Sequence, residues 1–201
     1  MTERDAWSSE GLRRAALEAL GALADERAVD ALVHGDFAVT PAAARWDASA
    51  GPVEAHRVTL ALDARRLGTL RAAPGVVDAL CAAVAAAVAT RAGQSLLELA
   101  LRWAPGARAA TMGYRDAPPP PVTLREGLVE YLDALGERSL ASAAAGAHLD
   151  AEDPSEVLLL VDRATFDALR SDAHAHTVLT RALRDLLGRP DVRVREQSDR
   201  P

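Results

Sequence analysis

The sequence predicts an α/β (α+β) protein made of two tandem, divergent copies of a small helix-strand-helix-helix-strand module. Residues 58–71 read VTLALDARRLGTLR, residues 157–170 read VLLLVDRATFDALR, and the two windows align without a gap. Each reads as an apolar strand, an aspartate and a short helix. The identical pairs are Val58/Val157, Leu60/Leu159, Asp63/Asp162, Leu70/Leu169 and Arg71/Arg170.

Four consecutive prolines separate the copies and predict a stiff polyproline II segment. We therefore expect a first module over residues 1–115, a linker over residues 116–122 and a second module over residues 123–201. The alternative for the prolines is a rigid surface loop inside one domain. With 201 residues, 49% of them apolar and 3% aromatic, the chain has enough Ala, Leu and Val for a substantial core.

The first module is expected to begin with a helix over residues 8–33, where apolar residues recur at helical spacing, and Gly35 should end it. Residues 37–39 predict a short strand. Residues 40–52 are rich in Ala, Pro, Ser and Gly and predict a loop from which Trp46 folds back onto the core.

Alternation of apolar residues predicts a strand over residues 58–62, and Asp63 should cap a helix over residues 64–70. Pro74 opens a second helix, expected over residues 76–91, with Gly93 as its stop. Residues 95–103 predict another strand, and residues 108–114 a return strand. The residues expected on one face of the 95–103 strand are Leu97, Leu99, Leu101 and Trp103.

The second module repeats this plan. Thr123 should cap a helix to about residue 135, and residues 139–147 predict a second short helix. The apolar run over residues 156–161 is typical of a central strand covered on both faces. Asp162 should cap a helix over residues 163–169.

The last helix should begin at Ser171 or Asp172 and reach about residue 187, before a closing strand around Val192 and Val194. Two strands joined by crossover helices predict a parallel pair. Each half should therefore be a small sheet with helices packed on it.

All 23 basic residues are arginine, as expected of a GC-rich bacterial genome, and the net charge is −6. An acidic chain is a poor general ligand for nucleic acid, because that affinity depends on basic side chains. The most apolar run, residues 76–89, is too short to span a bilayer, and the polar first ten residues do not resemble a signal peptide. We expect a cytoplasmic protein.

Catalytic and ligand motifs are absent from the sequence, so we predict no catalytic residue, cofactor or metal. Asp63 and Asp162 would need to converge to act as a carboxylate pair, and two helix caps are the simpler interpretation. Asp172, His174 and His176 are too closely spaced on a helix to share a metal easily. Cys81, the only cysteine, sits among apolar residues and predicts a buried structural thiol.

His56 and His148 are isolated in the sequence and are expected to face solvent. Arginines near the C-terminus form the most distinctive polar surface that the sequence predicts, a strip expected to join the last helix and last strand. The candidate binding residues are Arg181, Arg184, Arg193 and Arg195. The alternative is a solvated face balanced by neighbouring acids.

Residues 123–196 resemble the KH-like modules at the C-terminus of the bacterial clamp-loader tau subunit and at the N-terminus of the replication initiator. The resemblance lies in VLLLVD, RATFDALR, HTVLTRALRDLLGRP and DVRVRE, with a Gly–Arg–Pro turn before the last strand. It implies a protein-docking role and no catalytic residue. The N-terminal half has the same layout with a longer loop.

The function predicted is therefore a non-enzymatic protein–protein interaction or adaptor protein, whose partner is another protein with an acidic surface. One alternative is a small-ligand-binding protein or enzyme with a cleft between the modules, since clefts form at domain interfaces. The second alternative is a nucleic-acid-binding protein that uses the C-terminal arginine strip. The sequence specifies neither the partner nor the oligomeric state.

Overall fold

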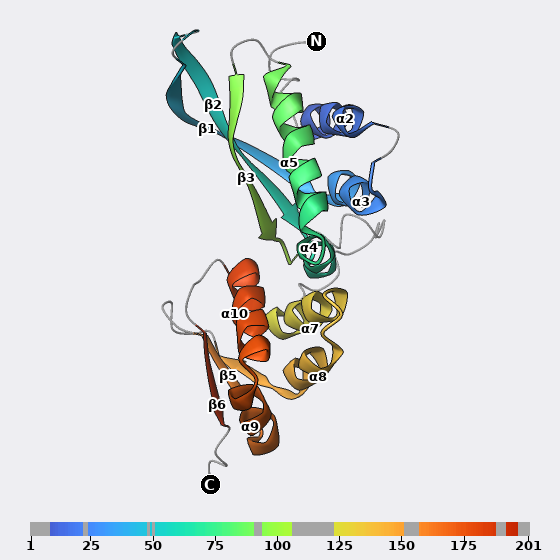
Figure 1. The fold of residues 1–201 in the computed structure, drawn as a ribbon, viewed down its shortest axis with the longest axis vertical. Coiled ribbons are helices and arrows are strands. Elements are labelled where there is room, and N and C mark those ends of the chain that lie inside the picture. Colours follow the sequence, from blue (N-terminus) through green and yellow to red (C-terminus); the bar gives the residue numbers. More distant parts are fainter. Residues whose placement is uncertain are drawn as a thin grey trace, which may run out of the picture.

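The computed structural model describes residues 9–21, 24–47, 49, 51–90, 94–105, 123–150, 157–187 and 192–196, with backbone alone for 43–47, 150, 192 and 194–196. These residues form mixed helix and strand structure with a three-stranded sheet in each half (Figure 1), which confirms the predicted α/β class. The predicted strand over residues 108–114, the linker over residues 116–122 and the Trp46 side chain lie outside what is described.

In the described part of the first half, two helices stand where the sequence predicted one. α2 (Ser9–Leu20) ends at Gly21, whose φ of +74° suits glycine. α3 (Glu26–His34) then begins at Asp25, whose side chain accepts a hydrogen bond from the backbone N–H of Arg27 at 2.9 Å. The prediction of one continuous helix was wrong because both helices turn apolar residues to the same core, so the break leaves little trace in the periodicity.

A long hairpin replaces the loop predicted over residues 40–52. β1 (Asp36–Asp47) pairs antiparallel with β2 (Gly51–Leu62) from end to end, with one register shift between Ala42 and Arg45. Composition misled the prediction here because β1 is an edge strand, a position in a sheet where proline is tolerated. Gly51 takes the positive φ of the turn, +81°.

Two helices then return the chain to a strand parallel to β2, as predicted. Asp63 caps α4 (Ala64–Arg71), with its side chain accepting from the backbone N–H of Arg66 at 2.8 Å. Next come α5 (Pro74–Ala89) and β3 (Gln94–Trp103). The alternating residues predicted to face the core are fully buried: Val58, Leu60 and Leu62.

The pairing of β3 with β2 contains an irregularity that reverses the alternation on β3. The register shifts between His56 and Arg57, so Leu97 bulges outward and is 39% exposed. Leu99, Leu101 and Trp103 still pack against the core, as predicted. His56 is buried, which corrects the expectation that it faces solvent, because β2 is the central strand.

The second half also begins with a helical pair. Thr123 and Glu126 form a capping box that starts α7 (Leu124–Ala134), and α8 (Arg138–Gly146) follows. A three-residue strand that the sequence did not predict, β4 (His148–Asp150), pairs antiparallel with β5 (Val157–Val161). His148, on β4, is exposed as expected.

Asp162 caps α9 (Arg163–Ser171), and Asp172 accepts hydrogen bonds from the first backbone N–H groups of α10 (Ala173–Leu187). β6 (Val192–Glu196) then pairs parallel with β5. Within the described residues, both halves therefore have the order helix, helix, strand, strand, helix, helix, strand. The predicted module lacked one helix and one strand. Descent of the halves from one duplicated unit stays a prediction.

The two halves are packed against each other. α4 lies against α7, and α10 lies against both α7 and β3 (Figure 1). The buried apolar residues of the two halves join into one continuous cluster, which includes Leu67 and Leu70 of α4 with Leu128 and Leu132 of α7.

Candidate functional site

The contact between the halves depends on a glycine in α4. A Cβ on Gly68 would lie 2.6 Å from the carbonyl oxygen of Tyr131 in α7, a distance that no real Cβ adopts. It would also lie 3.1 Å from the Cβ of Ala134. The two helix backbones therefore approach as closely as they do because position 68 carries no side chain.

A second glycine, from the other half, seats the end of β3. A Cβ on Gly127 would lie 2.9 Å from Cζ2 of Trp103. The indole, at the last residue of β3, consequently lies directly on the first turns of α7. Each half therefore contributes one glycine at which a group of the other half approaches too closely for a side chain.

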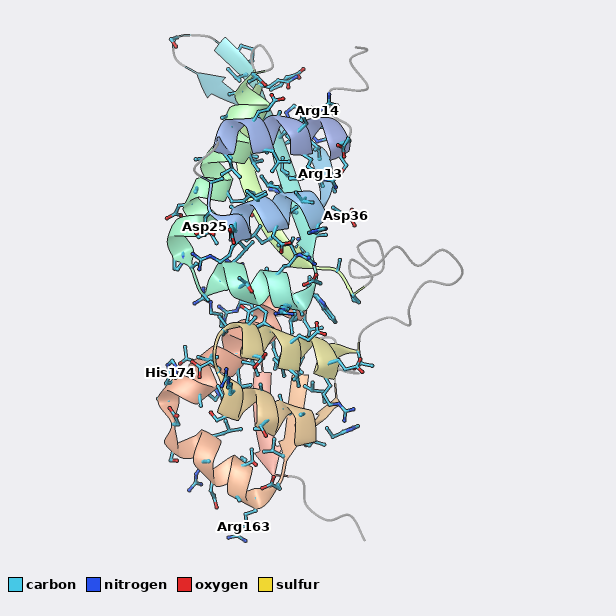
Figure 2. All side chains as sticks on the ribbon, turned by 90° about the vertical axis from the view of Figure 1, so that its right-hand side faces the viewer. Arg13, Arg14, Asp25, Asp36, Arg163 and His174 are labelled. Carbon is cyan, nitrogen blue, oxygen red and sulfur yellow. The ribbon has the colours of Figure 1, made fainter. Side chains whose placement is uncertain are left out.

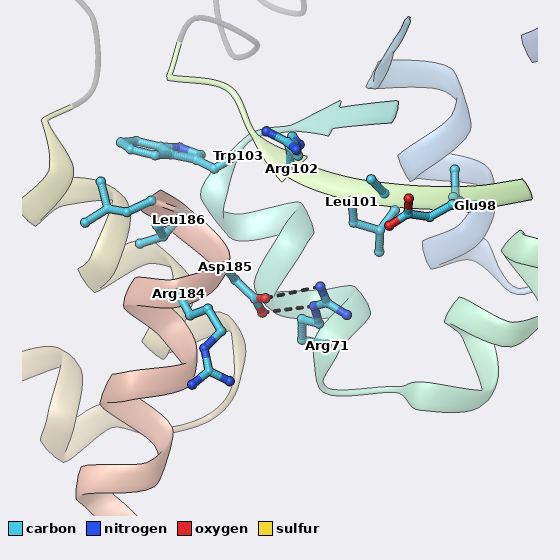
Figure 3. A pocket seen from close by; sticks show the side chains of 11 residues that line it. Arg71, Glu98, Leu101, Arg102, Trp103, Arg184, Asp185 and Leu186 are labelled. Atoms are coloured by element: carbon cyan, nitrogen blue, oxygen red, sulfur yellow. Dashed lines mark hydrogen bonds and ion pairs between the residues drawn. The ribbon is translucent and has the colours of Figure 1, made fainter. Parts of the chain in front are cut away.

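A buried tyrosine and an ion pair lie beside this contact. The Tyr131 hydroxyl donates a hydrogen bond to Oδ2 of Asp185 at 2.6 Å, and Nη2 of Arg71 donates to Oδ1 of the same carboxylate at 3.1 Å. Arg71 Nε also lies 2.9 Å from Oδ2 (Figure 3). Burial, together with the Asp185 carboxylate, raises the pKa of Tyr131 well above its ordinary value, so this phenol remains a donor.

Above the ion pair, a cavity of about 490 Å³ opens between the halves (Figure 3). One wall is residues 98–103 of β3, and the other is residues 184–187 at the C-terminal end of α10. Arg71 of α4 also lines the cavity. We call this cavity the inter-half cleft.

The charges of the inter-half cleft are unevenly matched. Its two acids are both neutralised, Asp185 by Arg71 and Glu98 by the exposed Arg57 of β2 at 2.7 Å. Arg102 on the β3 wall and Arg184 on the α10 wall are exposed, and within the described residues neither has an ion-pair or hydrogen-bond partner. The cleft therefore carries two uncompensated positive charges beside Leu101, Trp103 and Leu186.

A smaller cavity of about 340 Å³ lies between α3 and α4. Its charges are largely engaged: Arg66 pairs with both Asp30 and Asp63, and Arg27 pairs with Asp25. Of these pairs, only Arg66–Asp30 connects α4 to α3; the other two lie at the start of a single helix. The smaller cavity offers no ligand a comparable charge.

The two repeated aspartates are helix caps, as predicted. Asp63 accepts from Arg66, and Asp162 accepts from the backbone N–H of Thr165 at 2.9 Å. The Asp162 pKa is lowered mainly by that backbone hydrogen bond. Each carboxylate is thus engaged by its own helix.

The two closely spaced histidines, His174 and His176, lie in the first turn of α10, and Asp172 accepts hydrogen bonds from the backbone N–H groups of His174 and Ala175. Nε2 of His174 lies 3.1 Å from Oε1 of Glu137, the residue before α8. Among the described residues, no group of three or more His, Cys, Asp or Glu side chains is placed to hold a metal ion. Cys81 is half-buried in α5, and burial raises the pKa of its thiol, which favours the unreactive protonated form.

The predicted arginine strip is divided between two places. Arg181 and Arg184 are exposed on α10, and Arg184 faces the inter-half cleft. Arg193 is exposed on β6, whose main helical neighbour is α9, while the side chain of Arg195 lies outside what is described. α10 packs chiefly on α7, β3 and α9.

Sequence reasoning missed Arg71, Arg102, Trp103 and Asp185 as residues of one site. Arg71 did carry a signal, because it is one of the identities between the repeated windows. The others come from separate elements, and only the packing of α10 on β3 brings them together.

Residues 12–35 match the family model of the PBS lyase HEAT-like repeat. The match covers most of α2 and all of α3, a helical pair as in HEAT repeats, which generally mediate protein–protein interactions. No curated protein matches the chain. In the described part of the chain no single helix is long and apolar enough to cross a membrane; α4 and α5 reach that length only as a pair bent by 106°.

Proposed function

We propose that this chain is a non-enzymatic protein-interaction adaptor, whose inter-half cleft receives an acidic segment of another protein. The observation that carries the proposal is the charge of the cleft: its acids are neutralised while Arg102 and Arg184 are unpaired within the described residues. Unpaired cations beside apolar side chains attract and orient an acidic chain. The HEAT-like match of residues 12–35 is compatible with this role.

The KH-like resemblance of residues 123–196 belongs to the same proposal, because it too implies docking of a protein. Apart from the additional strand β4, the order of α7, α8, β5, α9, α10 and β6 follows the layout on which that resemblance rests. In this view both halves are docking modules, held together so that one cleft lies between them.

The ionisable groups of the cleft favour binding over catalysis. A general base needs a pKa near the working pH and an available lone pair. Asp185 is engaged by both Arg71 and Tyr131, and the raised pKa of Tyr131 keeps its proton in place. What remains are two guanidiniums, which bind anions and do not exchange protons at neutral pH.

A second candidate is a small anionic ligand in the same cleft. The observation that favours it is the cavity volume, about 490 Å³, which falls in the range of ligand pockets. Such a ligand would use the same two arginines without needing a peptide backbone.

Peptide display against the full chain tests the proposal. The wild-type protein should enrich acidic sequences, and the double variant Arg102→Glu/Arg184→Glu should lose them, with affinities for the enriched peptides falling by roughly tenfold or more. The matched control is Arg14→Glu/Arg163→Glu, which reverses two exposed arginines near opposite ends of the molecule (Figure 2). It should bind as the wild type does.

Two outcomes contradict the adaptor proposal. Enrichment of peptides without an acidic bias would show that the arginines are not the determinant. Absence of any peptide, together with saturable binding of a small polyanion such as citrate that Arg102→Glu/Arg184→Glu abolishes, would favour the small-ligand candidate.

A further inference from the structure

The inter-half cleft follows the edge of β3 rather than one of its faces. Six consecutive residues, 98–103, line it. Neighbouring side chains of a strand point to opposite faces, so a cavity on one face touches every second residue. A cavity that touches every residue in turn must run along the strand's edge, which both faces share. This edge carries the backbone N–H and C=O groups that β2 does not use.

The hydrogen bonds to β2 indicate which groups those are. The N–H of Ala104 donates to the carbonyl of Leu62 at 2.8 Å. In a parallel ladder alternate residues direct both backbone groups to the same neighbour. The even-numbered residues of this stretch therefore face β2, and Leu99, Leu101 and Trp103 direct their N–H and C=O groups into the cleft. Within the described residues β3 pairs on its β2 side alone.

Other strand edges in the described part of the chain carry features that discourage pairing. β1 contains Pro41 and a register shift between Ala42 and Arg45. β4 has three residues, and the VRVRE sequence of β6 places charges along a strand of five. β3 has ten residues without proline, and its single irregularity, at Leu97, precedes the stretch that lines the cleft.

We propose that β3 accepts an acidic, extended segment of the partner protein as an added strand, paired with the outward backbone groups of Leu99, Leu101 and Trp103. This inference rests on the proposed function and specifies its mode. Strand addition supplies main-chain hydrogen bonds, and side-chain charges select the sequence. Arg102 beside the new strand and Arg184 across from it select acidic side chains, since Glu98 and Asp185 are already neutralised.

Amide hydrogen exchange by NMR on the full chain tests this mode directly. The probe is an acetylated peptide of about eight alternating valine and glutamate residues, long enough to follow the six residues of the cleft wall. At a peptide concentration about ten times its Kd, the exchange of the Leu99, Leu101 and Trp103 amides should slow by about tenfold. The amides of Ala100 and Arg102, which face β2, should change much less.

A backbone-ester analogue of the same peptide separates hydrogen bonding from charge. Esters keep the side chains, the charges and the extended shape but remove the N–H donors. The analogue should bind at least about tenfold more weakly than the amide peptide, as expected when hydrogen bonds at an interface are left unmade.

The outcomes distinguish the two proposals. If the peptide binds and Arg102→Glu/Arg184→Glu abolishes that binding, while the three amides are unprotected or the ester binds equally well, strand addition is wrong and the docking cleft stands. If neither this peptide nor any displayed acidic peptide binds, both proposals are wrong.

Discussion

Gly68 and Gly127 each make room for a group of the opposite half. Substitution at Gly68 measures how much the close approach of α4 and α7 contributes to the free energy of unfolding. Gly68→Ala should destabilise the protein by about 1–3 kcal/mol, because its Cβ would collide with backbone that cannot move aside. The matched control is Gly75→Ala in α5, where a Cβ meets nothing within 4 Å. That change should be neutral or stabilising by up to about 1 kcal/mol.

Urea unfolding of the two alanine variants checks this prediction. A Gly68→Ala protein as stable as Gly75→Ala would mean that α4 and α7 can separate without loss. The contact would then be an incidental feature of the packing.

Tyr131→Phe should reveal how much the Tyr131 hydroxyl contributes to the free energy of unfolding, and how that contribution depends on pH. At neutral pH the loss of a hydrogen bond to a carboxylate should cost about 1.5–3 kcal/mol. The pKa of Tyr131 is raised in the folded state, so its contribution is complete below the unfolded value of about 10 and declines as pH rises above it.

The free energies of unfolding of wild type and Tyr131→Phe should therefore converge above about pH 10. Cys81, whose pKa is also raised, is common to both proteins and cancels from the comparison. A difference that stays constant from neutral to alkaline pH would show that the phenol is not held protonated by the fold.

For single residues, the sequence predicted the roles that depend only on neighbouring residues in the chain. Asp63, Thr123 and Asp162 cap their helices as expected, because a cap needs only the neighbouring backbone. It could not predict that Arg71 and Asp185 pair, since they are far apart in the chain and meet only through packing of the halves.

Among the elements, β5 is the central strand of the second sheet and can be tested with one charge. Leu159 is 1% exposed, so Leu159→Asp should bury an unpaired carboxylate and cost several kcal/mol, unfolding the C-terminal half. Leu97→Asp is the matched control, because Leu97 is 39% exposed on its bulge.

Thermal melts followed by circular dichroism distinguish the two variants. Leu159→Asp should lose cooperative melting, and Leu97→Asp should melt close to wild type. Equal melting temperatures would mean that β5 tolerates charge and is not the centre of its sheet.

Long periodic elements were predicted well, and short or paired ones were not. α5, α7 and α10 lie close to where expected, and β2 contains the predicted strand over residues 58–62 but begins earlier, at Gly51. β1 and β4 owe their conformation to pairing with β2 and β5, which composition does not reveal. The apolar stripe continues across the break between α2 and α3, so the pattern hid Gly21.

At the scale of the whole molecule, two groups of arginines can be compared as the docking surface: those of the inter-half cleft and those near the C-terminus. The strip predicted from sequence gives a competing test: if that strip is the docking face, Arg193→Glu/Arg195→Glu should lower association mainly through the on-rate, and added salt should mimic it. Surface plasmon resonance with the display-selected peptides, beside Arg102→Glu/Arg184→Glu, compares the two surfaces on one scale. An on-rate unaffected by the Arg193/Arg195 reversal would place docking elsewhere, with the cleft as the remaining candidate.

The seating of α4 on α7 affects any experiment that cuts the chain. A fragment that stops before Thr123 would bare Trp103 and the Gly68 side of α4, and the complementary fragment would bare Tyr131 and Leu128. Newly exposed apolar surface of this kind adheres to unrelated proteins and promotes aggregation. Binding experiments with deletion fragments would therefore detect the apolar surface exposed by truncation, and could find false partners or lose true ones. Single substitutions in the intact chain leave that surface covered.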